Sequence, residues 1–361
     1  MTSDGGISRR HLLRYGPAAC AAIAVFASGT NAHGQRKRQM RFVVISHSSN
    51  ATLHAPHMVA MELGFFREHG LTCTLIAPGA GTQVAQIIAS GQGAFGIGDT
   101  SHPVLMSQRG RPAVILFSTD TRCSYANIVV RKQLWDRGLR TVEQLATTRR
   151  ADGEPLTIAA TAIGAATWIY GNYILSQYRV NGRTVNDQVQ WSGGGESAIM
   201  LGGLRSGRFD AIMALPQWIE TARAEGFGEA LYDITSLAAW TRVFKGKLPN
   251  SVGYALKATL ADEPGLTQDY VSSIYEAMRW LRGRDPEQVY EKIGVKYMSL
   301  MSRRVVVDEV KYYQAIFNYD LVIPKADFDN VKRVFVPLLT KTDFSYEDLT
   351  DMRFAERARQ S

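Results

Sequence analysis

The sequence has few cysteines, no long apolar run and no block of like charges. It contains three cysteines in 361 residues, too few for a small domain built on a disulfide framework. No apolar run reaches the roughly 18 residues of a membrane-spanning helix. Lysine and arginine number 41 against 33 aspartates and glutamates. Because this surplus is dispersed along the chain, it indicates a solubilising surface and predicts no nucleic-acid partner.

Motifs of common enzyme active sites are also missing. There is no Gly-x-Ser-x-Gly elbow, no Walker-type phosphate loop and no His-Glu-x-x-His zinc motif. All the histidines precede residue 103, and imidazole is the commonest metal ligand. His54 and His57 have a suggestive spacing, but Pro56 interrupts the helix between them. We therefore predict no catalytic residue, metal or cofactor, and keep as the alternative an exported metal-dependent enzyme or metal-binding protein that uses these histidines.

The N-terminal segment has the composition of an export signal. Residues 8–14 contain paired arginines, a moderately apolar stretch follows at residues 18–27, and residues 30–32 are small or polar. This order is typical of a signal peptide, and paired arginines favour the twin-arginine route. We therefore predict that residues 1–32 are removed and that the mature chain, with a formal charge of +6 instead of +8, is periplasmic. Its two remaining cysteines, Cys73 and Cys123, fit either one disulfide or two thiols.

Five predicted elements recur at an offset of about 115 residues. In each unit a β-branched or apolar run leads through a small-residue turn into a helix, and a strand, a glycine-rich turn, a second helix and a third strand follow. The units are strand 42–46, helix 56–68, strand 72–76, turn 79–81 and strand 95–98, and then strand 156–160, helix 166–178, strand 189–191, turn 193–195 and strand 211–214.

Strands that alternate with helices at this spacing predict parallel sheets with right-handed crossovers. Such sheets bind ligands beyond the carboxyl ends of their strands. The second helix of each unit is followed by a Ser-Gly pair, Ser90-Gly91 and Ser206-Gly207, which predicts the helix end. Two copies of one β-α-β-α-β unit therefore predict two similar sheets whose binding edges face a common cleft.

Several segments, in this order and spacing, resemble the nitrate/sulfonate/taurine-type periplasmic binding proteins of ABC transporters. They are residues 61–71 (MELGFFREHGL), 89–91 (ASG), 95–98 (FGIG), 207–211 (GRFDA), 252–255 (VGYA), 275–281 (YEAMRWL) and 285–287 (DPE). The resemblance covers about residues 40–355. One departure is Ala94, where the family often has an acidic residue. Asp210 holds the equivalent position in the second unit and is expected to cap a turn.

This resemblance implies an α/β type II periplasmic-binding-protein fold, with two Rossmann-like lobes joined by a two-segment hinge. Lobe 1 would contain residues 40–124 plus 255–361, and lobe 2 residues 125–254. The implied function is capture of a small anionic organic solute, a sulfonate, a carboxylate or a related acid, in the cleft between the lobes. The partners would be this small-molecule ligand and an ABC transporter permease in the inner membrane, and the protein would be a monomer and not an enzyme.

The turns between strands and helices supply the predicted ligand-binding residues. Helix N-termini attract anions, although Ser and Thr in these turns are also ordinary helix caps. Arg122, at the first crossover between the lobes, is expected to supply the main positive charge through its planar guanidinium. The full predicted set is Ser48, Asn50, Ala51, Thr52, Gly81, Thr82, Asp99, Thr100, Ser101, Arg122, Gly164, Ala165, Ala166, Thr167, Gly195, Glu196, Gln217 and Trp218.

Overall fold

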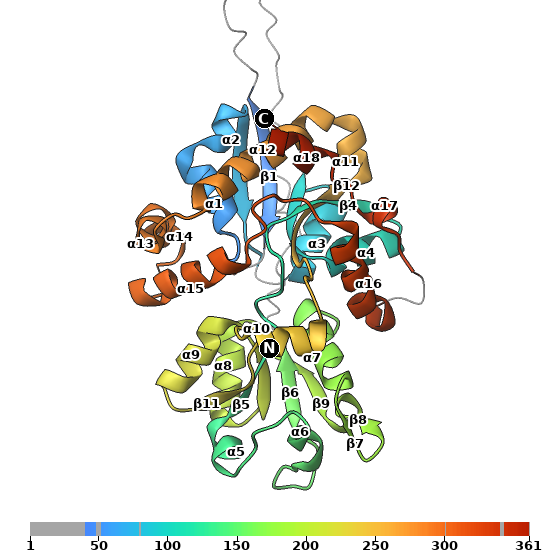
Figure 1. Ribbon diagram of the computed structural model, residues 1–361, viewed down its shortest axis with the longest axis vertical. Helices are drawn as coiled ribbons and strands as arrows, with labels where there is room; N and C mark the ends of the chain where they lie inside the picture. The colour runs from blue at the N-terminus through green and yellow to red at the C-terminus, as the bar shows by residue number, and fades with distance from the viewer. Residues whose placement is uncertain (1–39, 48–51, 79–80, 300, 340–342, 361) are drawn as a thin grey trace, which may run out of the picture. The chain divides into compact units, whose positions relative to one another are not determined.

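The computed structural model describes residues 40–47, 52–78, 81–299, 301–339 and 343–360 (Figure 1). The predicted signal peptide at residues 1–32 and its cleavage site lie outside the described residues. The described elements form two five-stranded sheets covered by helices, within one compact unit that spans Gln39–Ser361. This arrangement confirms the predicted α/β fold class. Among the described residues, no helix has both the length and the apolar character needed to cross a membrane.

The first sheet combines strands from the N-terminal part of the chain with one that returns from much later. Its order is β2-β1-β3-β12-β4, and β12 runs antiparallel to both of its neighbours while β1 is parallel to β2 and β3. The strands are β1 (Arg41–His47), β2 (Leu71–Ile76), β3 (Phe95–Asp99), β4 (Ala113–Ser118) and β12 (Ser251–Leu256).

The second sheet repeats this topology with its own crossing strand, β5, the antiparallel strand that the chain forms immediately after it leaves the first sheet. Its order is β11-β5-β10-β6-β9, where β6 is parallel to β9 and β10, and β5 is antiparallel to β10 and β11. Strands β6, β9 and β10 therefore correspond to β1, β2 and β3, as the internal repeat predicts. The strands are β5 (Asn127–Arg131), β6 (Thr157–Ala160), β9 (Gln190–Gly193), β10 (Ala211–Ala214) and β11 (Gly228–Tyr232).

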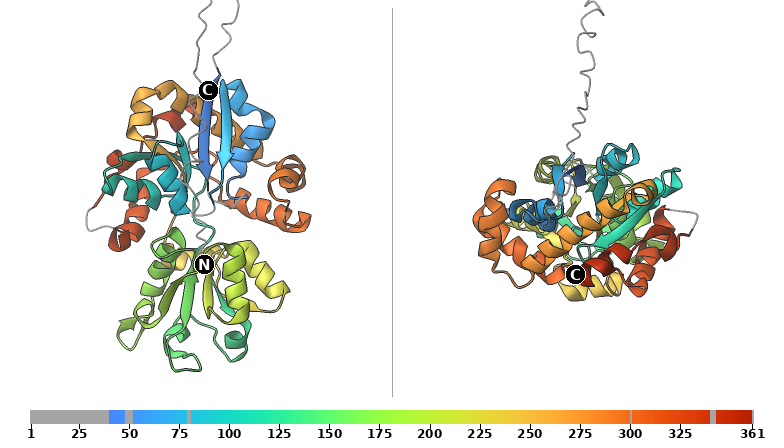
Figure 2. Two further views of the ribbon diagram at one scale, coloured as in Figure 1. Left: turned by 180° about the vertical axis from the view of Figure 1, so that it is seen from behind. Right: turned by 90° about the horizontal axis from the view of Figure 1, so that it is seen from above.

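Helices cover both sheets, and a long C-terminal series packs mainly around the first (Figures 1 and 2). The helices of the N-terminal unit and the second sheet are α1 (Ala55–Leu63), α2 (Phe65–Glu68), α3 (Gly81–Ala89), α4 (Ser101–Gln108), α5 (Lys132–Asp136), α6 (Gln144–Thr147), α7 (Ala166–Ser176), α8 (Ser197–Ser206), α9 (Pro216–Ala224) and α10 (Leu237–Phe244). A small hairpin, β7 (Arg179–Val180) and β8 (Arg183–Thr184), precedes the 3-10 turn η1 (Asn186–Gln188).

The C-terminal series follows β12. It comprises α11 (Lys257–Asp262), α12 (Pro264–Leu281), α13 (Pro286–Val289), the π-helical turn η2 (Tyr290–Gly294), α14 (Val295–Tyr297), α15 (Arg303–Ile316), α16 (Lys325–Leu339), α17 (Tyr346–Leu349) and α18 (Arg353–Gln360). Helix α12 contacts α1, α2 and α18, so it joins the beginning of the chain to its end.

The prediction of a single helix at residues 56–68 is wrong in one respect. Gly64 has φ = 84°, in the left-handed region, and separates α1 from α2. A side chain is strained at this backbone angle, whereas glycine adopts it freely. The predicted ends of α3 and α8 agree with the structure, because Gly91, two residues after α3, and Gly207, directly after α8, also have φ near 80°.

Each sheet has its own buried hydrophobic cluster. In the first, Tyr270 of α12 is fully buried and stacks on Phe95, with ring centroids 4.0 Å apart. In the second, the cluster includes Val331, Val334 and Phe335 of α16. Although α16 comes late in the chain, these three residues therefore belong to the core of the second sheet, whereas Phe328 of the same helix packs with residues of the first sheet.

Two further expectations concern single residues. Asp210 is fully buried and lies within 2.8 Å of the guanidinium groups of Arg131 and Arg150, so it forms a buried ion-pair group that joins β5 to β10 instead of only capping a turn. Cys73 and Cys123 are both free thiols, which decides between the two alternatives left by the sequence.

Candidate functional site

A cavity of about 770 Å³ lies at the carboxyl ends of strands from both sheets. This volume falls within the range of small-molecule sites, about 300–1,000 Å³, and the position is the one expected for open α/β sheets. Its lining combines apolar side chains with short polar turns. The lining residues are Leu53, Pro78, Gly81, Thr82, Gln83, Gly98, Asp99, Ser101, His102, Leu105, Tyr125, Thr161, Gly164, Ala165, Ala166, Thr167, Gly195, Glu196, Ser197, Leu201, Met213, Ala214, Leu215, Gln217, Trp218, Thr221, Asn250, Ser251, Tyr297, Met298, Ser299 and Met301.

Five helices begin at this cavity. Residues of the first turns of α3, α4, α7, α8 and α9 all belong to its lining. The first amides of a helix have no partner within the helix and carry partial positive charge. The cavity is therefore surrounded by the positive ends of helices from both sheets.

The N-termini of α7 and α8 have no side-chain caps. Their N-cap residues, Ala165 and Glu196, have extended backbones and make no capping hydrogen bond through their side chains. The two turns are also tied together, because the amides of Gly194 and Gly195 donate to the carbonyls of Ala160 and Thr161 at 2.7 and 2.9 Å. The first turns of α7 and α8 thus belong to adjacent parts of one lining, and an anionic group there can accept hydrogen bonds from their free amides.

Asp99 lies opposite, at the end of β3. Its Oδ1 accepts from the Ser101 amide at 2.8 Å, and its Oδ2 accepts from the Tyr125 hydroxyl at 3.0 Å. With its nitrogen turned toward Asp99, the Asn250 amide donates to Oδ2 at 2.7 Å. Burial raises the pKa of Asp99 to about 6, while these hydrogen bonds act in the opposite direction. At pH 7 the carboxylate therefore carries its charge, in a setting where all these partners are neutral.

His102, in the first turn of α4, also lines the cavity. Its Nδ1 lies 3.1 Å from the Tyr254 hydroxyl, and its ring packs so closely on Gly98 that a Cβ there would approach the ring to 2.5 Å. Burial lowers the pKa of His102 to about 4, so the imidazole is neutral at pH 7. It offers a hydrogen-bonding ring nitrogen but no charge.

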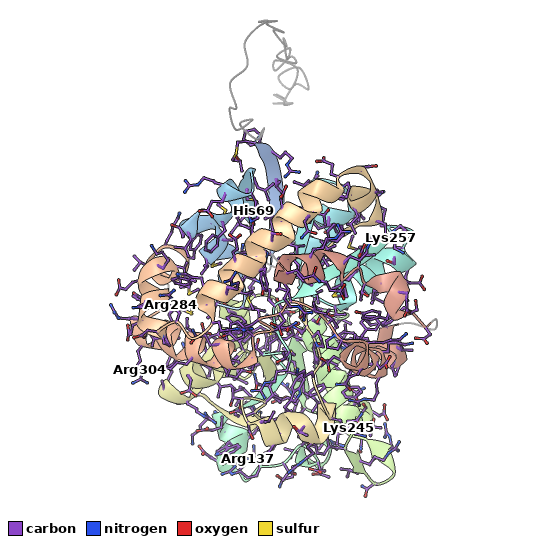
Figure 3. All side chains as sticks on the ribbon, turned by 45° about the horizontal axis from the view of Figure 1, so that its top comes forward. His69, Arg137, Lys245, Lys257, Arg284 and Arg304 are labelled. Carbon is purple, nitrogen blue, oxygen red and sulfur yellow. The ribbon has the colours of Figure 1, made fainter. Side chains whose placement is uncertain are left out.

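None of the described lining residues is a lysine or arginine. Residues 48–51, 79–80 and 300, which lie outside the description, contain none either. Basic side chains are instead exposed on outer surfaces, as Figure 3 shows for Arg137, Lys245, Lys257 and Arg304. The partial positive charge at the cavity therefore comes from helix N-termini, whereas the formal charges of its described lining are those of the Asp99 and Glu196 carboxylates.

The structure brings most of the described predicted residues together. Twelve of the eighteen predicted residues line the cavity: Gly81, Thr82, Asp99, Ser101, Gly164, Ala165, Ala166, Thr167, Gly195, Glu196, Gln217 and Trp218. Ser48, Asn50 and Ala51 lie outside the described residues. Thr52, Thr100 and Arg122 are described but do not belong to the lining.

Thr52 and Thr100 have hydrogen-bond partners elsewhere, and Arg122 lies beside an aromatic ring. Thr52 is buried and donates to the Glu309 carboxylate. Thr100 donates to the Pro249 carbonyl at 2.9 Å. The Arg122 guanidinium lies 6.0 Å from the ring centroid of Tyr312. The role of Arg122 as the main positive charge stays a prediction, and the amides of α7 and α8 offer the cavity a different source of positive charge.

Other lining residues are not among those predicted from the sequence. Tyr125 and Asn250 lie in the two crossover segments between the predicted lobes, so their position in the sequence could have identified them as candidate binding residues. His102 is one of the histidines that the sequence suggests only as metal ligands. Leu201, Met298 and Met301 supply apolar surface, and the sequence contains no pattern that assigns them to the cavity.

The predicted alternative of a metal site depends on the N-terminal histidines. His54 and His57 are buried, and burial lowers the pKa of His57 to about 3. The Nε2 atom of His57 lies 2.8 Å from the Tyr270 hydroxyl, within the hydrophobic core. Across the described parts of the chain, no three His, Cys, Asp or Glu side chains are grouped as metal ligands would be.

Known proteins share both the sequence pattern and the fold of this chain. The sequence pattern of the NMT1-like family matches residues 37–293, which is more than half of the chain. The chain belongs to the NMT1-like family. Comparison with curated protein sequences gave no match.

Solved structures with the same fold confirm the periplasmic-binding architecture of this NMT1-like protein. A Bordetella bronchiseptica RB50 protein is 20% identical, with a TM-score of 0.73 over 88% of this chain and 97% of its own. The periplasmic nitrate-binding protein NrtA from Synechocystis PCC 6803 is 13% identical, with a TM-score of 0.70 over 89% of each chain. The periplasmic sulfonate-binding protein SsuA from Methylobacillus flagellatus KT is 14% identical, with a TM-score of 0.63 over 90% of this chain and 95% of its own.

Proposed function

We propose that this NMT1-like protein is the solute-binding component of an ABC importer and captures a small organic solute that carries an acid group. The observation that carries the proposal is the convergence of five helix N-termini on one cavity, with the side-chain caps of α7 and α8 missing. An acid group accepts hydrogen bonds from such amides and interacts favourably with the helix dipoles. By their names, NrtA is a nitrate binder and SsuA a sulfonate binder, which supports an oxyanion as the recognised group.

The apolar part of the lining supports an organic solute over a bare inorganic anion. Leu201, Met298 and Met301 contribute hydrophobic side chains beside the polar turns. Burial of a carbon skeleton against them adds about 25 cal/mol for each Å² of apolar surface removed from water. A cavity of about 770 Å³ also exceeds the need of a three-atom or four-atom anion.

A thermal-shift panel tests this function. Each small carboxylate or sulfonate is paired with its neutral amide or alcohol analogue of similar size. We expect at least one acid to raise the melting temperature while its neutral analogue does not. A ligand at a hundredfold excess over its Kd stabilises the folded state by about 2.7 kcal/mol. If no acid in a broad panel shifts the transition, or if neutral analogues act equally, an acid group is not what the cavity recognises.

Export to the periplasm forms part of the proposal, because a solute-binding component works on the outer side of its permease. The sequence features that support export are the paired Arg9-Arg10 and the small residues before His33. We expect periplasmic material to begin near His33 when its N-terminus is sequenced. Replacement of Arg9-Arg10 by Lys-Lys should leave the precursor in the cytoplasm. Mature protein that retains residues 1–32 would contradict the export proposal.

We propose in addition that the two sheets belong to two lobes, residues 40–124 plus 255–361 and residues 125–254, which close on the solute about their connections. Helix α16 falls within the first range but packs against the second sheet, so it is a further connection between the two lobes. The polypeptide passes between the sheets from β4 to β5 and again from β11 to β12. Closure is favoured only by contacts that improve in the closed form. Small-angle scattering that gives the same radius of gyration with and without saturating solute would contradict the hinge.

A further inference from the structure

Two carboxylates line the cavity without a cationic partner. Asp99 is 4% exposed, and its hydrogen-bond donors are neutral groups, among them the Ser101 amide, the Tyr125 hydroxyl and the Asn250 side chain. Glu196, at the N-cap of α8, is exposed at the same cavity. Neither carboxylate forms an ion pair with a described residue.

A buried carboxylate without a counter-charge is unfavourable, because the surroundings solvate the charged form less well than water does. A solute with only negative charge would add to this cost when it entered the cavity. A solute with a protonated nitrogen would instead supply the missing positive charge to Asp99. The lining residues supply no such charge themselves, since none of those described is a lysine or arginine.

We propose that the solute is amphoteric, with its acid group at the first turns of α7 and α8 and a protonated nitrogen at Asp99. This inference rests on the proposed function and narrows it, from organic acids in general to short organic acids that also carry a basic amine, amidine or guanidine. The two ends of the cavity then have complementary roles. The α7 and α8 turns belong to the second sheet and Asp99 to the first, so an amphoteric solute bridges both sheets.

The surroundings of Asp99 are consistent with this role. Two other acidic side chains lie near it, Glu196 in the same cavity lining and Asp120, whose pKa burial raises to about 7. The other titratable side chains near it are neutral at pH 7. The neutral group comprises His102, Cys123, Tyr125, Tyr170 and Tyr254, since burial lowers the pKa of the histidine and raises those of the others. Because burial raises the pKa of Asp99 itself to about 6, attraction for a cationic nitrogen should be present at pH 7 and fade as the pH falls through 6.

Titration calorimetry with matched acids tests the inference. The probe pairs are 3-aminopropane-1-sulfonate against propane-1-sulfonate, and 4-(aminomethyl)benzoate against 4-methylbenzoate. We expect the amino member of at least one pair to bind wild-type protein roughly 10- to 150-fold more tightly, the range of one charge-assisted hydrogen bond. In the sulfonate pair neither probe titrates between pH 5 and 7, so a preference that falls over this interval reports on the protein.

Two variants assign the preference to one carboxylate. Asp99→Asn should remove the preference for the amino member, and the acid without an amine should bind at least as well as to wild type, because the carboxylate that repels it is gone. Asp262→Asn removes the same formal charge from an exposed position on α11, away from the cavity lining, and should keep the preference. If Asp99→Asn does not fold, the wild-type comparison and its pH dependence still decide the matter, because they need no variant.

The outcomes separate the inference from the function on which it rests. Equal binding of both members of each pair would overturn the amphoteric solute while leaving an acid-binding function intact. A preference that persists in Asp99→Asn would likewise overturn the inference, because the protonated nitrogen would not lie at Asp99. Failure of every acid in the pairs and in the broader panel to bind would overturn the proposed function, and the inference with it.

Discussion

The Ala165→Asp variant is expected to gain stability and to lose solute binding. Ala165 is the N-cap of α7, its backbone is extended with φ = −77° and ψ = 166°, and its side chain makes no capping bond. Aspartate is among the best N-cap residues, so the variant should be more stable by about 0.5–2 kcal/mol without solute. The same carboxylate would occupy the first-turn amides and repel an acid. We therefore expect the affinity for the acid to fall by roughly 10- to 150-fold.

Calorimetry and urea denaturation of the variant measure both effects. Ala258→Asp is the matched control, because Ala258 is exposed in the first turn of α11, which does not line the cavity. It adds the same charge near another helix N-terminus and should leave affinity unchanged. Ala165→Asn caps without a charge and should fall between wild type and Ala165→Asp. Wild-type affinity in Ala165→Asp would mean that the amides of α7 do not hold the acid group.

Phe335→Ala, in helix α16, is expected to cause a large loss of stability. Phe335 is fully buried in the cluster of the second sheet, and its ring meets the Tyr170 ring edge-on with centroids 5.6 Å apart. Truncation of a buried phenylalanine costs about 3–5 kcal/mol through lost burial and the cavity that remains. Urea denaturation followed by circular dichroism should therefore show a clearly lower midpoint.

The same substitution at Phe42 provides the control. Phe42 lies on β1 and is 85% exposed, so Phe42→Ala should change stability by no more than about 0.5 kcal/mol. Similar midpoints for Phe335→Ala and wild type would show that α16 does not contribute to the core of the second sheet.

The repeat accounts for most of what could be predicted from the sequence. Its strands recur as β1, β2 and β3 and as β6, β9 and β10. They could be predicted because the alternation of short β-branched runs with helical stretches is a local property of the sequence and does not depend on contacts between distant residues. The turn residues between them reach the cavity for the same reason, since parallel strands place their following turns at one sheet edge. The break at Gly64 is not predicted, because a glycine inside an amphipathic pattern does not by itself determine the backbone angle.

The remaining features depend on contacts between distant parts of the chain. Helical periodicity predicts that one face of α16 is buried, but it does not show that Val331, Val334 and Phe335 pack on the second sheet. The sequence likewise does not show that Arg122 lies beside Tyr312 instead of in the cavity, nor that Asp99 meets Tyr125 and Asn250. These arrangements follow from where the crossing strands β5 and β12 enter the two sheets.

Hydrogen exchange of the first-turn amides tests most directly whether helix N-termini hold the solute. With a saturating acid from the panel, followed by mass spectrometry of peptides, we expect slower exchange in peptides that cover residues 161–169 and 193–200. Exchange in peptides from the exposed first turn of α11, which begins at Lys257, should not change. If the acid binds and protects neither the α7 nor the α8 segment, then the helix N-termini at this cavity do not hold the solute, and the proposed mode of binding is contradicted.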